Sequence, residues 1–195
     1  MAERVADRRA ELLDAAVRVF AEKGFHATRV GDIATEAGVA HGLLYHYFRS
    51  KEEVLETVFR DTWSALVAET RRIEASDVPL REQLRLFARI YLGSWLQTPD
   101  LVRVLVREVA RGPGVGSRVA EIGELFDSLR RIIEAGQARG EVRPGLDPTI
   151  AAWALYGAHE EILTGWVLGQ LPGDAAEVDR AVTTVVELAY AGLAA

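Results

Sequence analysis

TRVGDIATEAGVAHGLLYHYFRSK, residues 28–51, decides the fold of this chain. Apolar residues recur at helical spacing over residues 30–37 and again over residues 39–48. Gly38 separates the two series, and glycine readily adopts the left-handed conformation that often follows a helix. Thr28 is the predicted N-cap of the first helix, because its hydroxyl can accept from a free backbone N–H. Two short helices around a tight turn are typical of a helix-turn-helix.

The helix predicted over residues 39–48 is short and aromatic. Leu44 and Phe48 are expected to face the core. The other positions combine hydrogen-bonding groups, small size and flat apolar rims, which suit a DNA groove: His41, Gly42, Leu43, Tyr45, His46 and Tyr47. Lys51 begins the next helix, where a cation and free backbone N–H groups can hold a phosphate. The alternative is that these aromatic side chains are ordinary core residues.

The amino-acid composition limits the classes of protein to which this chain can belong. The chain has 195 residues, of which 49% are hydrophobic, so it is expected to fold compactly. It has no cysteine, which excludes disulfides and thiolate metal sites. No apolar run reaches the about 18 residues of a membrane span, so we expect a cytoplasmic protein without a membrane partner. The net charge of −6 does not favour nucleic acid, so DNA binding would depend on Arg29, Arg49 and Lys51 around the motif.

Two adjoining segments, LLDAAVRVFAEKGFHATRV (12–30) and IATEAGVAHGLLYHYFRSKEEVL (33–55), resemble the DNA-binding region of the TetR family of bacterial transcriptional regulators. The resemblance implies an all-α fold, with a three-helix helix-turn-helix DNA-binding domain over residues 1–50. A helical bundle over 51–195 would bind ligand and supply dimerisation helices. The resemblance also implies a homodimeric repressor that binds a palindromic double-stranded DNA operator with half-sites about 34 Å apart.

The resemblance implies a set of DNA contacts within the helix-turn-helix. They are Thr28, Arg29, Ala40, His41, Gly42, Leu43, Tyr45, His46, Tyr47 and Lys51. Members of the family commonly carry Ser or Thr where this chain has Ala40. We therefore expect one hydroxyl contact to be absent.

The rest of the chain is predicted to be helical as well, because no segment alternates in the manner of a strand. Turns containing Gly or Pro separate the helices. The predicted ranges are 8–23, 51–75, 80–97, 99–111, 115–139, 147–170 and 174–193.

The helix predicted over 147–170 is apolar on several sides, which indicates burial on more than one side. Together with the last helix it could form a four-helix interface with a second subunit. The residues predicted for that interface are Ala154, Gly157, Glu161, Val178, Val182 and Val185. The alternative is that both helices close the core of a monomer.

A hydrophobic small-molecule effector is expected in the second half, where aromatic residues gather and His159 and Glu160 interrupt apolar stripes. Two arginine series, at 81, 85, 89 and at 103, 107, 111, are either solvated faces or the mouth of a site for a phosphate-bearing ligand. The candidate ligand-binding residues are Arg89, Tyr91, Trp95, Arg107, Phe126, Trp153, Tyr156, His159 and Glu160. The alternative for Glu160 is an internal bond to Arg107 or Arg89.

A second resemblance concerns IIEAGQARGEVRPGLDPTIAAWALYGAHEEILTGWVLG, residues 132–169. It is similar to the C-terminal region of TetR regulators of fatty-acid degradation, which long-chain acyl-coenzyme A releases from DNA. The effector it implies is an acyl-CoA thioester, and no cofactor is expected. The alternatives are a multidrug or other small-molecule effector.

An enzyme is the rival of a different class. The four histidines have no metal-ligand spacing, and no Ser-His-acid or phosphate-binding glycine pattern occurs. The sequence therefore predicts neither catalytic nor metal-binding residues. A dimeric interaction protein that does not bind specific DNA remains the other alternative.

Overall fold

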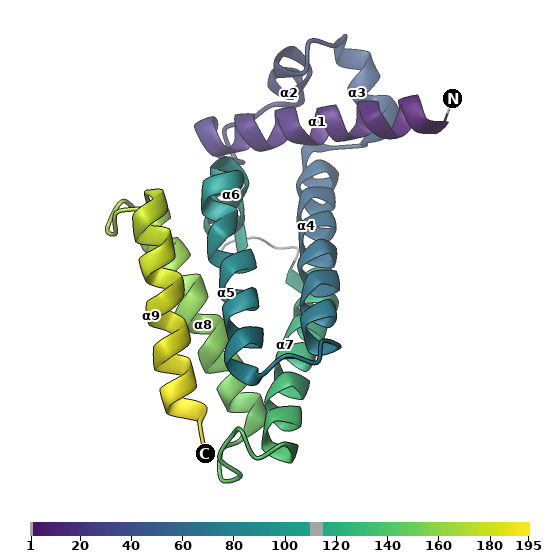
Figure 1. Ribbon diagram of the computed structural model, residues 1–195. Coiled ribbons are helices and arrows are strands. Elements are labelled where there is room, and N and C mark those ends of the chain that lie inside the picture. Colours follow the sequence, from purple (N-terminus) through teal and green to yellow (C-terminus); the bar gives the residue numbers. More distant parts are fainter. Residues whose placement is uncertain (1, 110–114) are drawn as a thin grey trace. The chain divides into compact units, whose positions relative to one another are not determined.

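The computed structural model describes residues 2–109 and 115–195, and within these ranges the regular elements are all helices (Figure 1). They are α1 (Ala2–Lys23), α2 (Val30–Glu36), α3 (His41–Tyr47), α4 (Lys51–Glu74), α5 (Leu80–Gln97), α6 (Pro99–Val109), α7 (Val115–Ala138), α8 (Pro148–Val167) and α9 (Ala175–Leu193). The all-α prediction is confirmed. Residues 110 and 111 of the helix predicted over 99–111 lie outside the described residues, as does the third arginine of the second series.

The chain divides into two compact units. The first takes residues 1–62 with 100–116, and the second takes 63–99 with 117–195. The division falls within α4, which has residues in both units. The functional boundary predicted between residues 50 and 51 stays a prediction.

A small hydrophobic core holds the first unit together. α1 packs on α2, and α2 packs on α3. α1 contributes Leu12, Ala16 and Phe20 at intervals of four residues, which place all three on one helical face. Leu44 and Phe48 are buried in this core, as the sequence predicted.

Local hydrogen bonds correct the predicted start of α2. Arg29, not Thr28, occupies the N-cap position. The buried Thr28 hydroxyl instead donates to the carbonyl oxygen of Gly24 at 2.8 Å. The Asp32 carboxylate caps the helix by accepting the Arg29 backbone N–H at 2.8 Å. This bond, together with one from the Lys23 ammonium, lowers the pKa of Asp32.

The predicted turn between α2 and α3 is confirmed, although α3 is shorter than the predicted helix. Gly38 has φ 65°, the left-handed conformation that favours glycine. The helix predicted from residue 39 begins at His41, because Val39 N–H still bonds back to the Ala34 carbonyl oxygen at 2.9 Å. α3 therefore spans two turns of helix.

The second unit is a helical bundle in which α9 packs along α5, and α8 contacts both (Figure 1). Its core includes Phe87, Leu92, Leu129 and Ile133. A bidentate ion pair joins the Glu74 carboxylate near the end of α4 to the Arg131 guanidinium on α7, at 2.5 and 2.9 Å. This pair lowers the pKa of Glu74 and fixes the second half of α4 on α7.

Aspartate caps explain where the last two helices begin. Asp147 accepts the backbone N–H groups of Thr149 and Ile150 at 2.8 and 3.0 Å, and Asp174 makes the equivalent bonds at the start of α9. These residues are N-caps, so the helices begin one residue later than predicted. α8 ends at Val167 rather than at residue 170, because Gly169 has φ 67°.

Within the described residues, no helix is both long enough and apolar enough to cross a membrane.

Candidate DNA-binding surface and ligand-binding region

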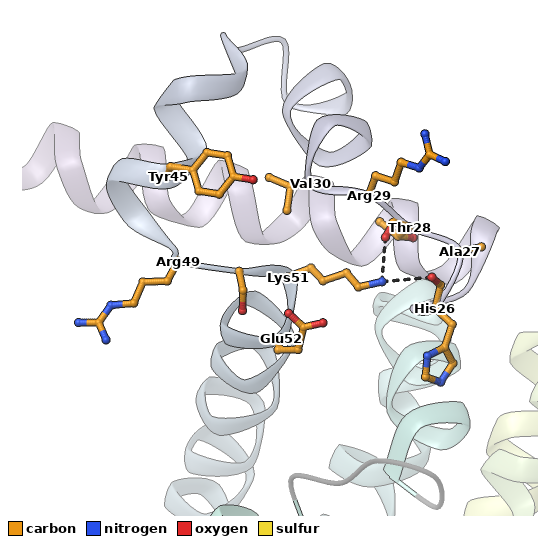
Figure 2. Close-up of a pocket in the computed structure, with 10 residues that line it drawn as sticks. His26, Ala27, Thr28, Arg29, Val30, Tyr45, Arg49, Lys51 and Glu52 are labelled. Carbon is orange, nitrogen blue, oxygen red and sulfur yellow. Dashed lines mark hydrogen bonds between the residues drawn. The ribbon is translucent and has the colours of Figure 1, made fainter.

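An open cleft of about 570 Å³ lies in the first unit, where the start of α2, the helix α3 and the start of α4 meet (Figure 2). Its lining includes six residues near the helix-turn-helix: His26, Thr28, Arg29, Tyr45, Arg49 and Lys51. Two helix N-termini open into this cleft, and helix N-termini attract anions through their free N–H groups and dipoles.

Lys51 connects the two sides of the cleft. Its ammonium donates to the carbonyl oxygens of Phe25, His26 and Thr28 at 2.9, 3.1 and 2.9 Å, and Figure 2 shows the bonds to His26 and Thr28. The same nitrogen lies 4.7 Å from the centre of the Phe25 ring. An ammonium has three donors, so these bonds use all of them. Lys51 therefore orders residues 25–28, and a phosphate here would be bound by backbone N–H groups of the first turn of α4.

Arg29 and Arg49 supply the free positive charge of the cleft. Both are exposed, and Figure 2 shows their guanidinium groups extending away from each other into solvent. Neither makes an ion pair with a described residue, whereas Arg18 and Lys23 in the same unit pair with Glu36 and Asp32. Acidic neighbours thus neutralise the cations of α1 and leave those at the cleft available to phosphate.

The outer surface of α3 carries several of the predicted DNA contacts. Tyr45 is 52% exposed, and its ring contacts the His41 ring edge-to-face at 5.6 Å. Gly42 and His46 are also exposed, whereas Leu43 and Tyr47 are half-buried. Exposed aromatic and imidazole groups on a short helix can reach base edges and thymine methyls.

Three local features shape this surface. A Cβ on Gly31 would lie 3.5 Å from His41 Nε2, an ordinary van der Waals distance, so the imidazole packs closely beside α2. Ala40 is the N-cap of α3 and provides no side-chain capping bond, as the resemblance implies. Glu53 accepts the Arg49 backbone N–H at 2.6 Å and so fixes the turn between α3 and α4.

In the second unit, two tyrosines bind the carboxylate of Glu160. Tyr91 donates its hydroxyl to Glu160 Oε2 at 2.5 Å, and Tyr156 donates to the same oxygen at 3.2 Å. Burial, reinforced by Glu160, raises the pKa of both tyrosines, which keeps the hydroxyls protonated as donors. Glu160 therefore makes internal bonds, as the alternative expected, but its partners are two tyrosines rather than an arginine.

The two arginines predicted for the ligand site belong to different units of the chain. Arg107 belongs to the first unit and donates to the Ala21 carbonyl oxygen at 3.1 Å. Arg89 is exposed and makes no ion pair with a described residue. Arg81 and Arg85, on the same helix, pair with Glu187 and Glu82. Because Arg81 and Arg85 form salt bridges, most of the first arginine series is better explained as a solvated helix face than as the mouth of a ligand site.

His159 is buried next to the tyrosines, with 1% of its surface exposed. Its Nδ1 lies 2.7 Å from the Leu155 carbonyl oxygen, and burial lowers its pKa to about 4. A carbonyl only accepts hydrogen bonds, so Nδ1 carries the proton and Nε2 is an acceptor. Nε2 has no partner among the described residues.

Aromatic rings surround this polar group. The His159 ring contacts Phe87 and Tyr91 with centroids 5.1 and 5.8 Å apart, and Tyr91 contacts Tyr156 at 5.6 Å. Tyr156 in turn contacts Trp63 at 6.3 Å. We call these five residues the aromatic cluster. The sequence prediction missed Trp63. Phe87 is one of the aromatic residues that gather in the second half, and it lies four residues before Tyr91 on one face of α5, although the candidate ligand-binding residues do not include it.

The remaining predicted ligand residues divide into two groups. Phe126 stacks on Trp153 with centroids 4.0 Å apart and contacts the edge of Tyr156, which extends the aromatic cluster toward α7. Trp95 instead stacks on Trp166 and donates its indole N–H to the Gly173 carbonyl oxygen at 2.9 Å. The structure therefore joins the first pair to the cluster and gives Trp95 a different set of contacts.

The residues predicted for the dimer interface fall into an exposed group and a buried group. Ala154, Gly157 and Glu161 are exposed along α8. Val178 and Val182 are buried within the chain itself, because α9 turns its valine stripe toward α5, and their place in an interface stays a prediction. Val185 is buried as well.

An apolar groove of about 340 Å³ runs between α8 and α9. Val185 lies in its lining, together with Ala154, Ala158 and Leu188. Ile150 and Leu188 are the most exposed large apolar residues of the two helices, at 67% and 69%. The prediction missed both, because the sequence alone did not determine which side of each helix faces the core.

Comparison with known proteins identifies the family. Residues 12–58 match the bacterial regulatory proteins of the tetR family, and residues 77–185 match the tetracyclin repressor-like C-terminal domain. The transcriptional repressor KstR2 of Rhodococcus jostii (strain RHA1) is 31% identical over 96% of this chain and 91% of its own length. The fatty acid metabolism regulator protein of Bacillus subtilis (strain 168) is 28% identical over 94% of each chain.

A solved structure has the same fold over nearly the whole chain. The transcriptional regulator FadR from Bacillus subtilis, in complex with stearoyl-CoA, superposes with a TM-score of 0.83 and 27% identity, covering 94% of this chain and 98% of its own. The two family matches include the helix-turn-helix and most of the second unit. They confirm a transcriptional regulator and not an enzyme. This chain belongs to the TetR family of bacterial transcriptional regulators.

Proposed function

We propose that this regulator is a homodimeric repressor that binds a palindromic operator through α3 and is released by an acyl-CoA thioester or a related hydrophobic effector. The main support for an acyl-CoA effector is the similarity to FadR from Bacillus subtilis, whose structure contains stearoyl-CoA. The aromatic cluster supports it from within the chain, because its rings provide an apolar environment with few polar groups.

The DNA-binding part of the proposal rests on the exposed surface of α3 and the cleft beside it. His41, Tyr45 and His46 would contact base edges or nearby backbone, while Arg29 and the first turn of α4 would bind phosphates. A two-fold dimer would present two such helices to half-sites about one DNA turn apart.

Substitution of Tyr45 by Ala tests the recognition helix. The operator is first selected from a random-sequence duplex library with the wild-type protein. We expect Tyr45→Ala to lose at least about tenfold in affinity for this duplex while it remains dimeric, since one side chain supplies about 1 to 3 kcal/mol of base discrimination. Tyr190→Ala, which changes a tyrosine of the second unit, is the matched control. Wild-type affinity in Tyr45→Ala would remove α3 from the interface.

Release would follow from a shift between two conformations with different affinities for operator and effector. α4 is the continuous element for this coupling: Lys51 at its start orders the cleft, and Trp63 further along belongs to the aromatic cluster. An effector that repacks Trp63 acts directly on the helix that carries Lys51.

A thermal-shift series with acyl-CoA thioesters of graded chain length tests the effector class. A ligand at 100 times its Kd stabilises the folded state by about 2.7 kcal/mol, which raises the Tm by several degrees. Free coenzyme A and free fatty acids are the controls. A rise with the thioesters alone supports the proposal, whereas a flat series would direct the search to multidrug-type effectors.

A further inference from the structure

We propose that the effector of this regulator carries an oxygen within its apolar portion, and that His159 Nε2 and Trp63 Nε1 bind that oxygen. The preferred effector is then a hydroxylated acyl group rather than a saturated one. This inference rests on the proposed acyl-CoA function and names the chemical class of its acyl part.

The starting observation is a pair of unsatisfied polar atoms in the interior. Among buried side-chain nitrogens and oxygens of the described residues, only Trp63 Nε1 and His159 Nε2 lack a hydrogen-bond partner. Trp63 is 6% exposed and His159 is 1% exposed. Buried polar groups of folded proteins are nearly always hydrogen-bonded, so two exceptions in one unit require a reason.

The two atoms belong to one continuous set of rings. Trp63 contacts Tyr156, Tyr156 contacts Tyr91, and Tyr91 contacts His159. Both atoms therefore belong to the aromatic cluster, which draws on α4, α5 and α8. In the proposed complex, one ligand hydroxyl among these rings donates to His159 Nε2 and accepts from Trp63 Nε1.

Neighbouring side chains do not satisfy either atom. The hydroxyl groups of Tyr91 and Tyr156 are the polar groups of the cluster that could donate to His159, and both already donate to Glu160. The Leu155 carbonyl oxygen is used by the other ring nitrogen of His159. The chain thus leaves one acceptor and one donor open.

The chemistry of the two atoms defines the complementary group. Nε2 of a neutral imidazole bonded through Nδ1 accepts a hydrogen bond, and an indole N–H only donates. A hydroxyl both donates and accepts, so it can bond to either atom, whereas a saturated chain leaves both unpaired. A site that presents buried polar groups discriminates strongly against a ligand that lacks their partner.

The test compares matched ligands. The probes are palmitoyl-CoA and three hydroxypalmitoyl-CoA isomers. Each isomer carries one hydroxyl, on C2, C3 or C16 of the acyl chain. Fluorescence anisotropy measures the ligand concentration that releases half of the selected operator. We expect at least one hydroxylated isomer to act at a roughly 10- to 100-fold lower concentration than palmitoyl-CoA.

Variants assign the preference to the two atoms. His159→Phe keeps a flat ring and removes the acceptor, and Trp63→Phe removes the indole donor. We expect that, in either variant, the hydroxylated isomer and palmitoyl-CoA release half of the operator at concentrations within about threefold of each other. Phe87→Leu changes a ring that contacts His159 without removing a polar atom, so it should retain the preference. Trp63→Phe keeps the test decisive if His159→Phe does not fold.

The outcomes separate this inference from the proposed function. Equal release by palmitoyl-CoA and all three isomers would overturn the hydroxyl inference and leave the acyl-CoA effector in place. A preference that survives both His159→Phe and Trp63→Phe would also overturn it. Release by none of the four thioesters would overturn the acyl-CoA effector, and the inference with it.

Discussion

Gly42 lies inside a helix, where glycine normally lowers stability. A Cβ at this position would meet no heavy atom of the protein within 4 Å. Neither packing nor a positive φ therefore requires the glycine. Its exposed position on α3 suggests that the missing side chain leaves room for DNA.

The variant Gly42→Ala separates the effect of this glycine on stability from its effect on DNA binding. We expect the free energy of unfolding to rise by up to about 1 kcal/mol, because alanine favours the helix, while operator affinity falls at least about fivefold. Urea unfolding and operator binding measure the two quantities. Gly93→Ala is the control, since Gly93 also lies in a helix with open space around its Cβ. Unchanged operator affinity in Gly42→Ala would contradict a close approach of DNA.

His159 gives the folded state a pH dependence with a defined sign. Its pKa falls from 6.5 to about 4 on folding because it is buried. The unfolded chain therefore takes up a proton at a pH where the folded chain does not, so the stabilisation is complete above about pH 6.5 and is lost as the pH falls toward 4.

The expected loss over this window is about 3 kcal/mol, from 1.36 kcal/mol per pKa unit. Urea unfolding of wild type and His159→Phe between pH 4 and 7.5, at one protein concentration, measures it. Carboxylates such as Glu74 titrate in both proteins, so the difference between the two curves isolates His159. If the free energies of unfolding of the two proteins changed with pH by the same amount, the imidazole would not be buried in its neutral form.

At the scale of elements, Lys51 joins the first turn of α4 to the segment that precedes α2. Lys51→Met would leave three carbonyl oxygens without their charged donor. We expect the free energy of unfolding to fall by at least about 2 kcal/mol and operator affinity to fall with it. Operator binding should weaken because Arg29 then loses its fixed position.

Lys23→Met is the control for this prediction. Lys23 pairs with Asp32 at the surface of the same unit, and an exposed pair contributes less than about 1 kcal/mol. Chemical denaturation followed by circular dichroism compares the two variants. Equal losses would show that the carbonyl contacts of Lys51 add nothing to an ordinary surface lysine.

At the scale of the whole molecule, the exposed apolar side chains of α8 and α9 determine the proposed dimer. Ile150 and Leu188 project beside a groove that contains Ala154 and Ala158. Small residues let helices approach closely, and large exposed ones provide apolar area to bury. This face, rather than the valines of α9, is where we expect a second copy.

Leu188→Arg tests that face. Analytical ultracentrifugation should find a folded monomer, and affinity for the palindromic duplex should fall by more than about 100-fold, because one subunit reads only a half-site. Leu96→Arg is the matched control, since Leu96 is 47% exposed on α5. A dimer that persists in Leu188→Arg and dissociates in Leu96→Arg would place the interface on another face.

The sequence by itself determined the helical elements and their order. Gly38, the aspartates at 147 and 174 and the apolar spacing around Leu44 act through neighbouring residues, so their effects can be predicted from local chemistry. The beginnings of α4, α5 and α9 follow from such signals to within about a residue, whereas α3 begins two residues later than predicted. The free cations at Arg29 and Arg49 also lie where the motif places them.

Only the tertiary structure decided which partners the polar groups take and which helix faces remain exposed. Tyr91 lies 69 residues before Glu160, and its hydroxyl took the place of the arginine that the sequence suggested. The valines of α9 became core because α5 covers them, which left Leu188 outside. The ammonium of Lys51 is bound by carbonyl groups of a distant loop. These outcomes depend on contacts between segments far apart in the chain, which local propensity and periodicity do not determine.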